Sequence, residues 1–355
     1  MTNRKITYRL YPNQQQTESL TELLGLHQRV YNAALEERIR IYQEMGKSLS
    51  FASQCKILTQ WRQKYPELKK LNAQSLQVTL KRLDLAFQAF FRRVKRKEKA
   101  GFPRFKSLQR FRGWGYKTHG DGWRLLAGEG LRHGCLRLSG IGYIKIRGKA
   151  RTLGEPKTAE ILHKSGKWYL SVTIECQPQR VCGSKAIGFD WGVEQFLVSH
   201  DSHDQIDSVK NPRHLKKMLP LLRSLQRSVS KKRKGSKNRK KAAKLLAKQH
   251  HRIANRRKDF HHQTAAKLVK ENGLIAFEAL SIKAMTAKGG ARKRGLNREI
   301  LSTAPTQFHA LLKSKAEEAG AMCVEIPTRE VRPSQTCHRC RKQEKKALSE
   351  LLAYL

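Results

Sequence analysis

Two short apolar runs in this sequence each end in a carboxylate. The first run, Ala186–Phe189, leads to Asp190, which is flanked by glycines, and the second, Leu274–Phe277, leads to Glu278. Apolar runs of this length are typical of strands buried in a parallel sheet. If the two strands are neighbours, both carboxylates lie at the same edge of that sheet.

A pair of adjacent carboxylates favours a divalent cation. Two such groups a few ångströms apart repel each other, and a cation between them removes the repulsion. A site of this kind holds Mg²⁺, which activates a water and stabilises the leaving oxygen of a phosphodiester. Acids at strand ends are common, however, so the purely structural interpretation of Asp190 and Glu278 stays open at this point.

The charge of the chain favours the functional interpretation. Its 355 residues include 74 Lys and Arg but only 28 Asp and Glu, which gives a formal net charge of +46 at pH 7. Such a field concentrates polyanions, so nucleic acid is the expected partner. A membrane-surface protein is the weaker alternative because no basic amphipathic helix dominates. A nuclease needs both features, a basic surface for phosphates and an acidic metal site.

Basic residues concentrate in residues 209–270. The apolar spacing predicts one helix around Leu215–Leu225 and a second, antiparallel helix around Ala242–Ile253. The tip between them cannot bury its charges, and we expect it to be disordered or laid along a phosphate backbone. We take these tip residues as nucleic-acid-binding: Lys231, Lys232, Arg233, Lys234, Lys237, Arg239, Lys240 and Lys241.

The first half of the chain predicts a strand, then helices, then several short strands. Ile6–Leu10 alternates as a half-buried strand, and Asn13 and Gln16 have the spacing of a capping box for the helix that follows. The clearest helix, Leu76–Val94, ends in the basic run Arg92–Lys99. Such a run is usually a solvated face, but the total charge favours phosphate contact. Beyond residue 101, short strands separated by glycines predict an antiparallel β unit.

Four ring-bearing residues of this half allow two interpretations. Trp114, Tyr116 and Trp123 lie between basic residues and could stack on bases, but packing in the core of the β unit is an equal alternative. His27 lies on the apolar stripe of the first helix. We predict that it is a packed core histidine and not a ligand.

The cysteines indicate a reducing compartment and half of a zinc ribbon. Of seven cysteines, only Cys337 and Cys340 are closely paired, which fits a cytoplasmic protein better than a disulfide framework. A structural zinc site needs four ligands, and no second CxxC follows. Three roles therefore stay open for the Cys337–Cys340 pair. It could bind Zn²⁺ with the other ligands missing or supplied by another molecule, it could be a redox pair, or it could be a remnant that binds no metal. No run of eighteen apolar residues predicts a membrane span.

Several motifs together resemble the OrfB/TnpB family, which bacterial and archaeal insertion sequences encode and which is related to type V CRISPR effectors. The motifs are spread along the whole chain: Tyr8–Asn13, Gly101–Lys106, Gly140–Ile146, Gly166–Tyr169, Gly188–Gly192, Phe277–Leu280 and Ser334–Cys337.

The resemblance implies an α+β multidomain fold. A wedge-like β-barrel would consist of residues 1–13 and 101–180, and a helical recognition domain of residues 14–100. An RNase H-like, RuvC-type nuclease domain would follow over residues 185–355. It would include the basic helical insertion 209–270 and a half zinc ribbon at 334–345.

The resemblance also implies the partners and the chemistry. Members of the family use a guide RNA to direct Mg²⁺-dependent cleavage of matching DNA, so both nucleic acids are expected partners of a nucleoid-associated protein. By position, Asp190 and Glu278 match the first two catalytic acids. We add Arg104 and Lys106 of the Gly101–Lys106 motif to the nucleic-acid-binding residues.

The tail departs from the family pattern. Members carry a second CxxC and then an Asp in an Asp-Arg-Asp-x-Asn-like segment, and this sequence has neither. Glu344 and Glu350 lie in other contexts, so neither is assigned as the third acid. The resemblance is therefore to a C-terminally truncated copy with impaired cleavage. The alternatives are a nuclease-inactive, RNA-guided DNA-binding protein or repressor, and a general structural RNA-binding protein.

Overall fold

The chain forms two compact units, each with its own hydrophobic core. The computed structural model describes residues 2–150, 152–177, 180–203, 205–287 and 290–327. The N-terminal unit spans Met1–Gln177 and the C-terminal unit spans Pro178–Leu355. Within the described ranges, no helix combines the length and the apolar character that crossing a membrane requires.

The N-terminal unit combines three α-helices with seven strands among its described residues. Its elements are β1 (Thr2–Tyr11), α1 (Gln14–Met45), α2 (Phe51–Lys64), the 3₁₀ helix η1 (Pro66–Lys70), α3 (Ala73–Lys95), β2 (Gly113–Tyr116), β3 (Trp123–Gly128), the 3₁₀ helix η2 (Glu129–Leu131), β4 (Arg132–Leu138), β5 (Gly142–Lys149), β6 (Glu155–Lys164) and β7 (Lys167–Cys176).

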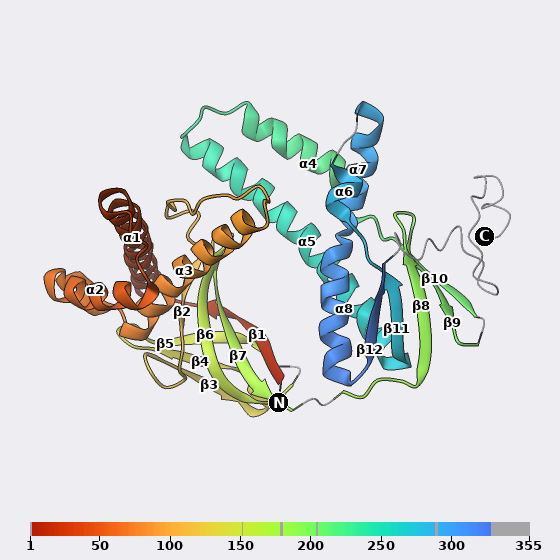
Figure 1. Cartoon of the computed structure of the whole chain (residues 1–355), viewed down its shortest axis with the longest axis horizontal. Helices are drawn as coiled ribbons and strands as arrows, with labels where there is room; N and C mark the ends of the chain where they lie inside the picture. Colours follow the sequence, from red (N-terminus) through yellow and green to blue (C-terminus); the bar gives the residue numbers. More distant parts are fainter. Residues whose placement is uncertain (1, 151, 178–179, 204, 288–289, 328–355) are drawn as a thin grey trace. The chain divides into compact units, whose positions relative to one another are not determined.

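The strands of this unit form one antiparallel sheet with β1 in the middle. The order is β2-β6-β7-β1-β5-β4-β3, and the sheet curves into a half-barrel (Figure 1). Within the described residues β2 and β3 are its edges, so the sheet is a half-barrel and not the closed barrel that we expected. Helices α1 and α3 pack against each other and against β2.

The ring-bearing residues in question lie in the core of this unit. Trp114, Tyr116 and Trp123 are almost completely buried, with exposed fractions of 0%, 5% and 2%. Stacking on bases is therefore the wrong interpretation for these three. His27 is buried as well, stacks on Trp114 and lies 2.9 Å from Oγ1 of Thr79, which confirms it as a core histidine.

The C-terminal unit combines a mixed sheet with helices. Its described elements are β8 (Lys185–Trp191), β9 (Gln195–Asp201), β10 (Ile206–Lys210), α4 (His214–Ser230), α5 (Lys237–Glu271), β11 (Asn272–Glu278), α6 (Ile282–Thr286), α7 (Ala291–Thr303), α8 (Pro305–Ala319) and β12 (Met322–Ile326).

The sheet of this unit has the order β10-β9-β8-β11-β12. Strands β8, β11 and β12 run parallel, whereas β9 and β10 are antiparallel to their neighbours. The two acid-ended runs are thus adjacent parallel strands, as the sequence predicts. Helix α8 and the C-terminal part of α5 pack against one face of the sheet, and α4 and α5 form a helical hairpin (Figure 1).

Two buried histidines should make the C-terminal unit sensitive to acid. Burial lowers the pKa of His261 and of His309 to about 4. In the unfolded chain each imidazole takes up a proton near pH 6.5. The stability that the neutral imidazoles contribute is therefore complete above about pH 6.5 and decreases as the pH falls toward about 4, by about 1.4 kcal/mol per pH unit for each histidine.

Chemical denaturation across this pH range measures the effect. The His261→Gln variant should show a shallower loss of stability below about pH 6.5 than the wild type. The exposed His250 is the matched control, and His250→Gln should keep the wild-type slope. Parallel curves for His261→Gln and wild type would contradict the assignment.

Candidate carboxylate site and basic hairpin

Asp190 and Glu278 lie side by side at the carboxyl ends of β8 and β11. In the parallel register Phe189 is level with Phe277, so the residues that follow them are level too. Neighbouring strands are about 4.8 Å apart. Because side chains alternate along a strand, both carboxylates lie on the face opposite to the buried phenylalanines.

Two stacked rings fix this register. The rings of Phe189 and Phe277 lie 5.4 Å apart at an angle of 15°, and Phe308 of α8 contacts Phe189 edge-on at 6.1 Å. A slip of one residue would turn one phenylalanine out of the core and its carboxylate into it. Aromatic packing below the sheet therefore determines that the two carboxylates stay together above it.

Both carboxylates are available to an external cation. Asp190 is exposed and Glu278 is half-buried. Oδ1 of Asp190 accepts a hydrogen bond of 2.7 Å from the N–H of Trp191, which orients the carboxylate. Among the described residues, neither carboxylate forms a salt bridge with a Lys or Arg side chain.

The surface beside Asp190 leaves room for a ligand. Gly188 lies two residues earlier on the same face, and a Cβ added there would have no atom within 4 Å. Mg²⁺ is commonly held by one or two carboxylates together with waters and substrate phosphates. The two oxygen ligands and the open face fit this ion. In the part of the chain that the structure describes, no cluster of three or more His, Cys, Asp or Glu could hold a metal.

The predicted half zinc ribbon at 334–345, with Cys337 and Cys340, lies outside the described residues, as do Glu344 and Glu350. Cys323 of β12 packs against the core of the C-terminal unit. Burial raises the pKa of its thiol in the metal-free chain.

Most of the predicted tip residues of the α4–α5 hairpin are exposed. Lys232 and Arg239 instead tie the tip together: Nη1 of Arg239 donates to the carbonyl of Lys232 at 3.1 Å, and Nζ of Lys232 donates to Oγ of Ser228 at 3.2 Å. These two bonds connect the tip internally, and its placement along a phosphate backbone stays a prediction. The exposed cations are Lys231, Arg233, Lys234, Lys237, Lys240 and Lys241.

The start of helix α5 is electropositive from two sources. Ser236 caps the helix by accepting from the N–H of Arg239, and no acid lies in the first turn. The helix dipole places partial positive charge at this end, and Lys237 and Lys240 add full charges. Cations at a helix N-terminus are unfavourable unless an anion neutralises them. A phosphate bound at this end would supply that neutralisation.

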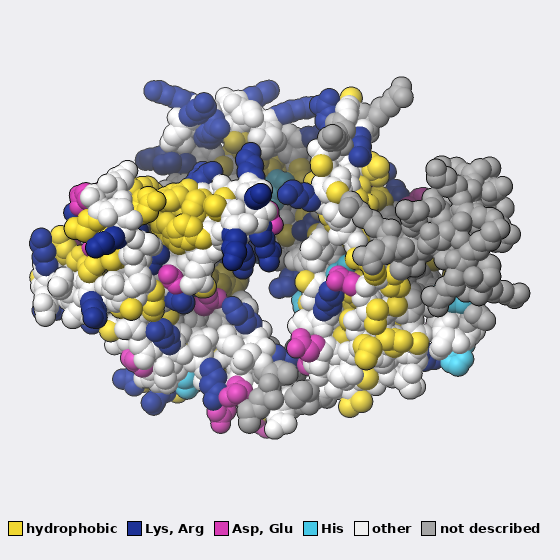
Figure 2. Space-filling view, in the orientation of Figure 1, with side chains coloured by type: hydrophobic (Ala, Val, Ile, Leu, Met, Phe, Trp, Pro, Cys, Tyr) yellow, Lys and Arg dark blue, Asp and Glu magenta, His cyan; other side chains and the backbone are white. Residues whose placement is uncertain are grey.

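A stripe of cations continues along α5 at intervals of four residues, so each member neighbours the next while the stripe winds around the helix by about 40° per step. It spans about 24 Å, since each residue adds about 1.5 Å. Figure 2 shows Lys and Arg side chains gathered over the hairpin. We failed to select most of this stripe from the sequence, although its spacing was the available signal. Its exposed members are Lys240, Lys244, Lys248, Arg252 and Arg256.

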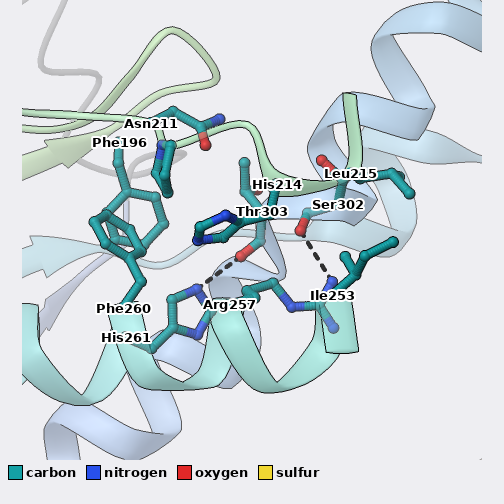
Figure 3. Close-up of a pocket in the computed structure, with 11 residues that line it drawn as sticks. Phe196, Asn211, His214, Leu215, Ile253, Arg257, Phe260, His261, Ser302 and Thr303 are labelled. Carbon is teal, nitrogen blue, oxygen red and sulfur yellow. Dashed lines mark hydrogen bonds between the residues drawn. The ribbon is translucent and has the colours of Figure 1, made fainter. Parts of the chain in front are cut away.

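Helix α5 is anchored below this stripe, at the small cavity drawn in Figure 3. Nε2 of His261 lies 2.9 Å from the carbonyl oxygen of Thr303, so the ring donates from Nε2. Nη1 of Arg257 donates to the carbonyl of Ser302 at 3.0 Å. These two bonds connect α5 to the end of α7 and hold the hairpin on the C-terminal unit.

Arg104 and Lys106 belong to the N-terminal unit and differ in their surroundings. Arg104 is exposed. Lys106 is half-buried, with its ammonium 4.2 Å from the centre of the Tyr31 ring, and its backbone N–H donates to Asn32. Burial and the nearby Arg82 lower the pKa of Lys106. Lys106 is therefore held against Tyr31 and Arg104 is open to solvent, and the phosphate contact of both residues stays a prediction.

Comparison with known proteins places the chain among mobile-element proteins. Residues 169–288 match the OrfB_IS605 family, described as "Probable transposase". Residues 1–47 match its helix-turn-helix domain, and in this structure they form β1 and the single long helix α1.

Two relatives that match over most of the chain agree with this result. A "Putative RNA-guided DNA endonuclease" of Streptomyces pristinaespiralis is 30% identical over 335 residues, which cover 91% of this chain and 77% of the relative. The "Putative RNA-guided DNA endonuclease InsQ" of Escherichia coli (strain K12) is 27% identical over 94% of this chain and 81% of the relative.

A solved structure shares the fold. The protein chain in the cryo-EM structure of a Cas12f1–sgRNA–target DNA complex matches with a TM-score of 0.63 and 16% sequence identity. The match covers 96% of this chain and 78% of that chain.

Removing two cations from the α5 stripe should reduce the salt dependence of duplex DNA binding. Each neutralised phosphate contributes about 0.9 to the slope of log K against log salt concentration. The Lys244→Gln/Lys248→Gln double variant should therefore lose about 1.8 from that slope. The control is Lys47→Gln/Lys56→Gln, which removes the same charge from exposed positions of the N-terminal unit. Fluorescence anisotropy at several salt concentrations measures the slope for each double variant. Equal slopes for the Lys244→Gln/Lys248→Gln variant and the control would contradict the assignment.

Proposed function

The chain belongs to the OrfB/TnpB family of insertion-sequence-encoded proteins, and on this basis we propose that it is an RNA-guided, Mg²⁺-dependent DNA endonuclease of RuvC type. A guide RNA selects the target DNA by pairing with it, and Asp190 and Glu278 form the cleavage site. One observation carries this proposal. The two carboxylates are level at the carboxyl edge of a parallel strand pair in a chain of net charge +46.

The domain assignment follows the family. Residues 185–355 form the RuvC-type domain, and the sheet order β10-β9-β8-β11-β12 supports an RNase H-like arrangement. The half-barrel of residues 1–13 and 101–180 is the wedge domain, and α1 to α3 form the recognition domain over 14–100. The hairpin within 209–270 holds the phosphates of the guide–target duplex. Zn²⁺ at Cys337 and Cys340 is part of this proposal, and metal analysis of Cys337→Ser tests it.

Asp190 and Glu278 would hold Mg²⁺. When bound, this ion supplies a nucleophilic water at neutral pH and stabilises the leaving oxygen of the phosphodiester. The chain itself supplies position: the Phe189–Phe277 stack holds the carboxylates level, and the Trp191 N–H fixes the orientation of Asp190. Gly188 leaves the sheet surface open for the approach of a DNA backbone.

The basic surfaces act separately from the carboxylates. Exposed cations on the tip and on the α5 stripe neutralise backbone phosphates, which raises affinity for any sequence and leaves selection to base pairing. Binding therefore does not require an intact cleavage site. This separation allows the alternative function, a nuclease-inactive RNA-guided DNA-binding protein or repressor.

Substituting either carboxylate should slow cleavage strongly and leave nucleic-acid binding unchanged. In the presence of Mg²⁺ and a matched guide, Asp190→Asn and Glu278→Gln should each lower the cleavage rate by about 10²- to 10³-fold, the usual loss for one well-placed electrostatic group. The control is Glu325→Gln. Glu325 lies on the neighbouring strand β12 and pairs with Lys313 at 2.7 Å. If Asp190→Asn cleaved DNA at the wild-type rate, Asp190 would not be part of the cleavage site.

Two further measurements separate the three functions. RNA that co-purifies with the protein is sequenced first: one enriched species supports guided function, and bulk RNA supports a general RNA-binding protein. The complex is then incubated with matched DNA and Mg²⁺. Cutting supports the endonuclease, whereas tight binding without cutting supports the nuclease-inactive alternative.

A further inference from the structure

Four phenylalanines form a cluster on the N-terminal unit that plays no part in the proposed cleavage site. Phe87, Phe90 and Phe91 belong to α3, and Phe102 belongs to the segment that follows it. Phe102 contacts Phe87 at 5.5 Å and Phe90 at 5.3 Å, both edge-on, and Phe90 contacts Phe91 at 5.2 Å. The cluster therefore holds the segment after α3 against the end of that helix.

The outer rings of this cluster are exposed. Phe87 is buried, with 8% exposure, and supports the others from below, whereas Phe91 and Phe102 are 54% and 48% exposed. The neighbouring Val94 and Phe105 are also exposed. Figure 2 shows hydrophobic side chains gathered over α3 and the segment after it, with Lys and Arg side chains around them. Contiguous exposed apolar surface of this kind marks an interaction site.

The charge around the cluster identifies the class of partner. Residues 92–106 contain eight Lys and Arg but only one acid, Glu98. The last turn of α3 alone contributes Arg92, Arg93 and Lys95, all of them exposed. A surface with this charge repels cationic partners and attracts polyanions. Exposed rings beside cations are the combination that binds single-stranded nucleic acid, because bases stack on the rings and phosphates contact the cations.

We propose that Phe91 and Phe102 form a stacking platform for unpaired bases of RNA, with the adjacent phosphates held by the cations of residues 92–99. The choice of RNA rests on the proposed function, since a guide RNA has segments outside the guide–target duplex, and unpaired bases are what proteins stack in RNA. Bases within the guide–target duplex are already stacked on each other and cannot use the platform. The geometry of the platform does not depend on the cleavage site.

Leucine substitutions test the stacking and keep the packing. Phe91→Leu and Phe102→Leu retain apolar bulk but lose the flat ring, whereas Phe102→Trp retains a ring. The matched control is Tyr42→Leu, which removes an exposed ring on α1, 64% exposed. The full-length protein, freed of bound RNA, is titrated with single-stranded RNA, single-stranded DNA and duplex RNA of the same length. A single 2-aminopurine in each strand reports stacking by fluorescence.

Each leucine variant should bind single-stranded RNA about fivefold to 100-fold more weakly than wild type and should lose the change in 2-aminopurine fluorescence. Phe102→Trp and Tyr42→Leu should bind as the wild type does, and affinity for duplex RNA should not change in any variant. Single-stranded DNA should bind the wild type more weakly than single-stranded RNA does.

Three results would overturn the platform. One is wild-type affinity for single-stranded RNA in both leucine variants, which indicates that the cluster packs against protein. The second is an equal loss for duplex RNA, and the third is a preference for single-stranded DNA. The proposed function fails separately, when a matched guide gives neither binding nor cutting of target DNA. Circular dichroism spectra that match the wild type show that the variants are folded, so that a loss of affinity reflects binding and not misfolding.

Discussion

The candidate cleavage site depends on the stack of Phe189 on Phe277. Each phenylalanine immediately precedes a carboxylate, and strand alternation places ring and carboxylate on opposite faces. The pairing that maximises ring contact below the sheet is therefore the one that brings Asp190 and Glu278 together above it. Two like charges repel, so the site could not select this register for itself. The hydrophobic core supplies the free energy, and α8 completes it through Phe308.

In the basic hairpin, as at the carboxylates, packing in the core holds charged groups in a position that they would not favour by themselves. Like charges four residues apart destabilise a helix by about 0.2–0.5 kcal/mol for each pair. Helix α5 tolerates its stripe because its C-terminal half is buried against the sheet and His261 and Arg257 connect it to α7. The half that carries the stripe has fewer buried side chains, among them Ala242 and Ile253. The repulsion that remains is what a phosphate backbone would relieve.

The sequence predicted those features that depend on local patterning. The adjacent parallel strands, the capping box of Asn13 and Gln16 and the core position of His27 all follow from spacing and apolar periodicity. The hydrogen bond from Arg239 to Lys232 within the hairpin tip could not be predicted, because charge counting does not reveal hydrogen bonds. Whether the strands close into a barrel depends on sheet curvature, which no single strand encodes. The packing of Lys106 on Tyr31 was equally invisible, because it joins residues distant in the sequence.

Strand β1 occupies the middle of the half-barrel, between β7 and β5. It is made before its partners, which lie about 130 to 170 residues further along the chain, at Gly142–Lys149 and Lys167–Cys176. On the ribosome, β1 must therefore remain unpaired until most of the N-terminal unit has been synthesised, which makes folding of this unit late and non-local. Loss of the first ten residues would remove more than an edge. It would divide the sheet into two unconnected groups, β2-β6-β7 and β5-β4-β3.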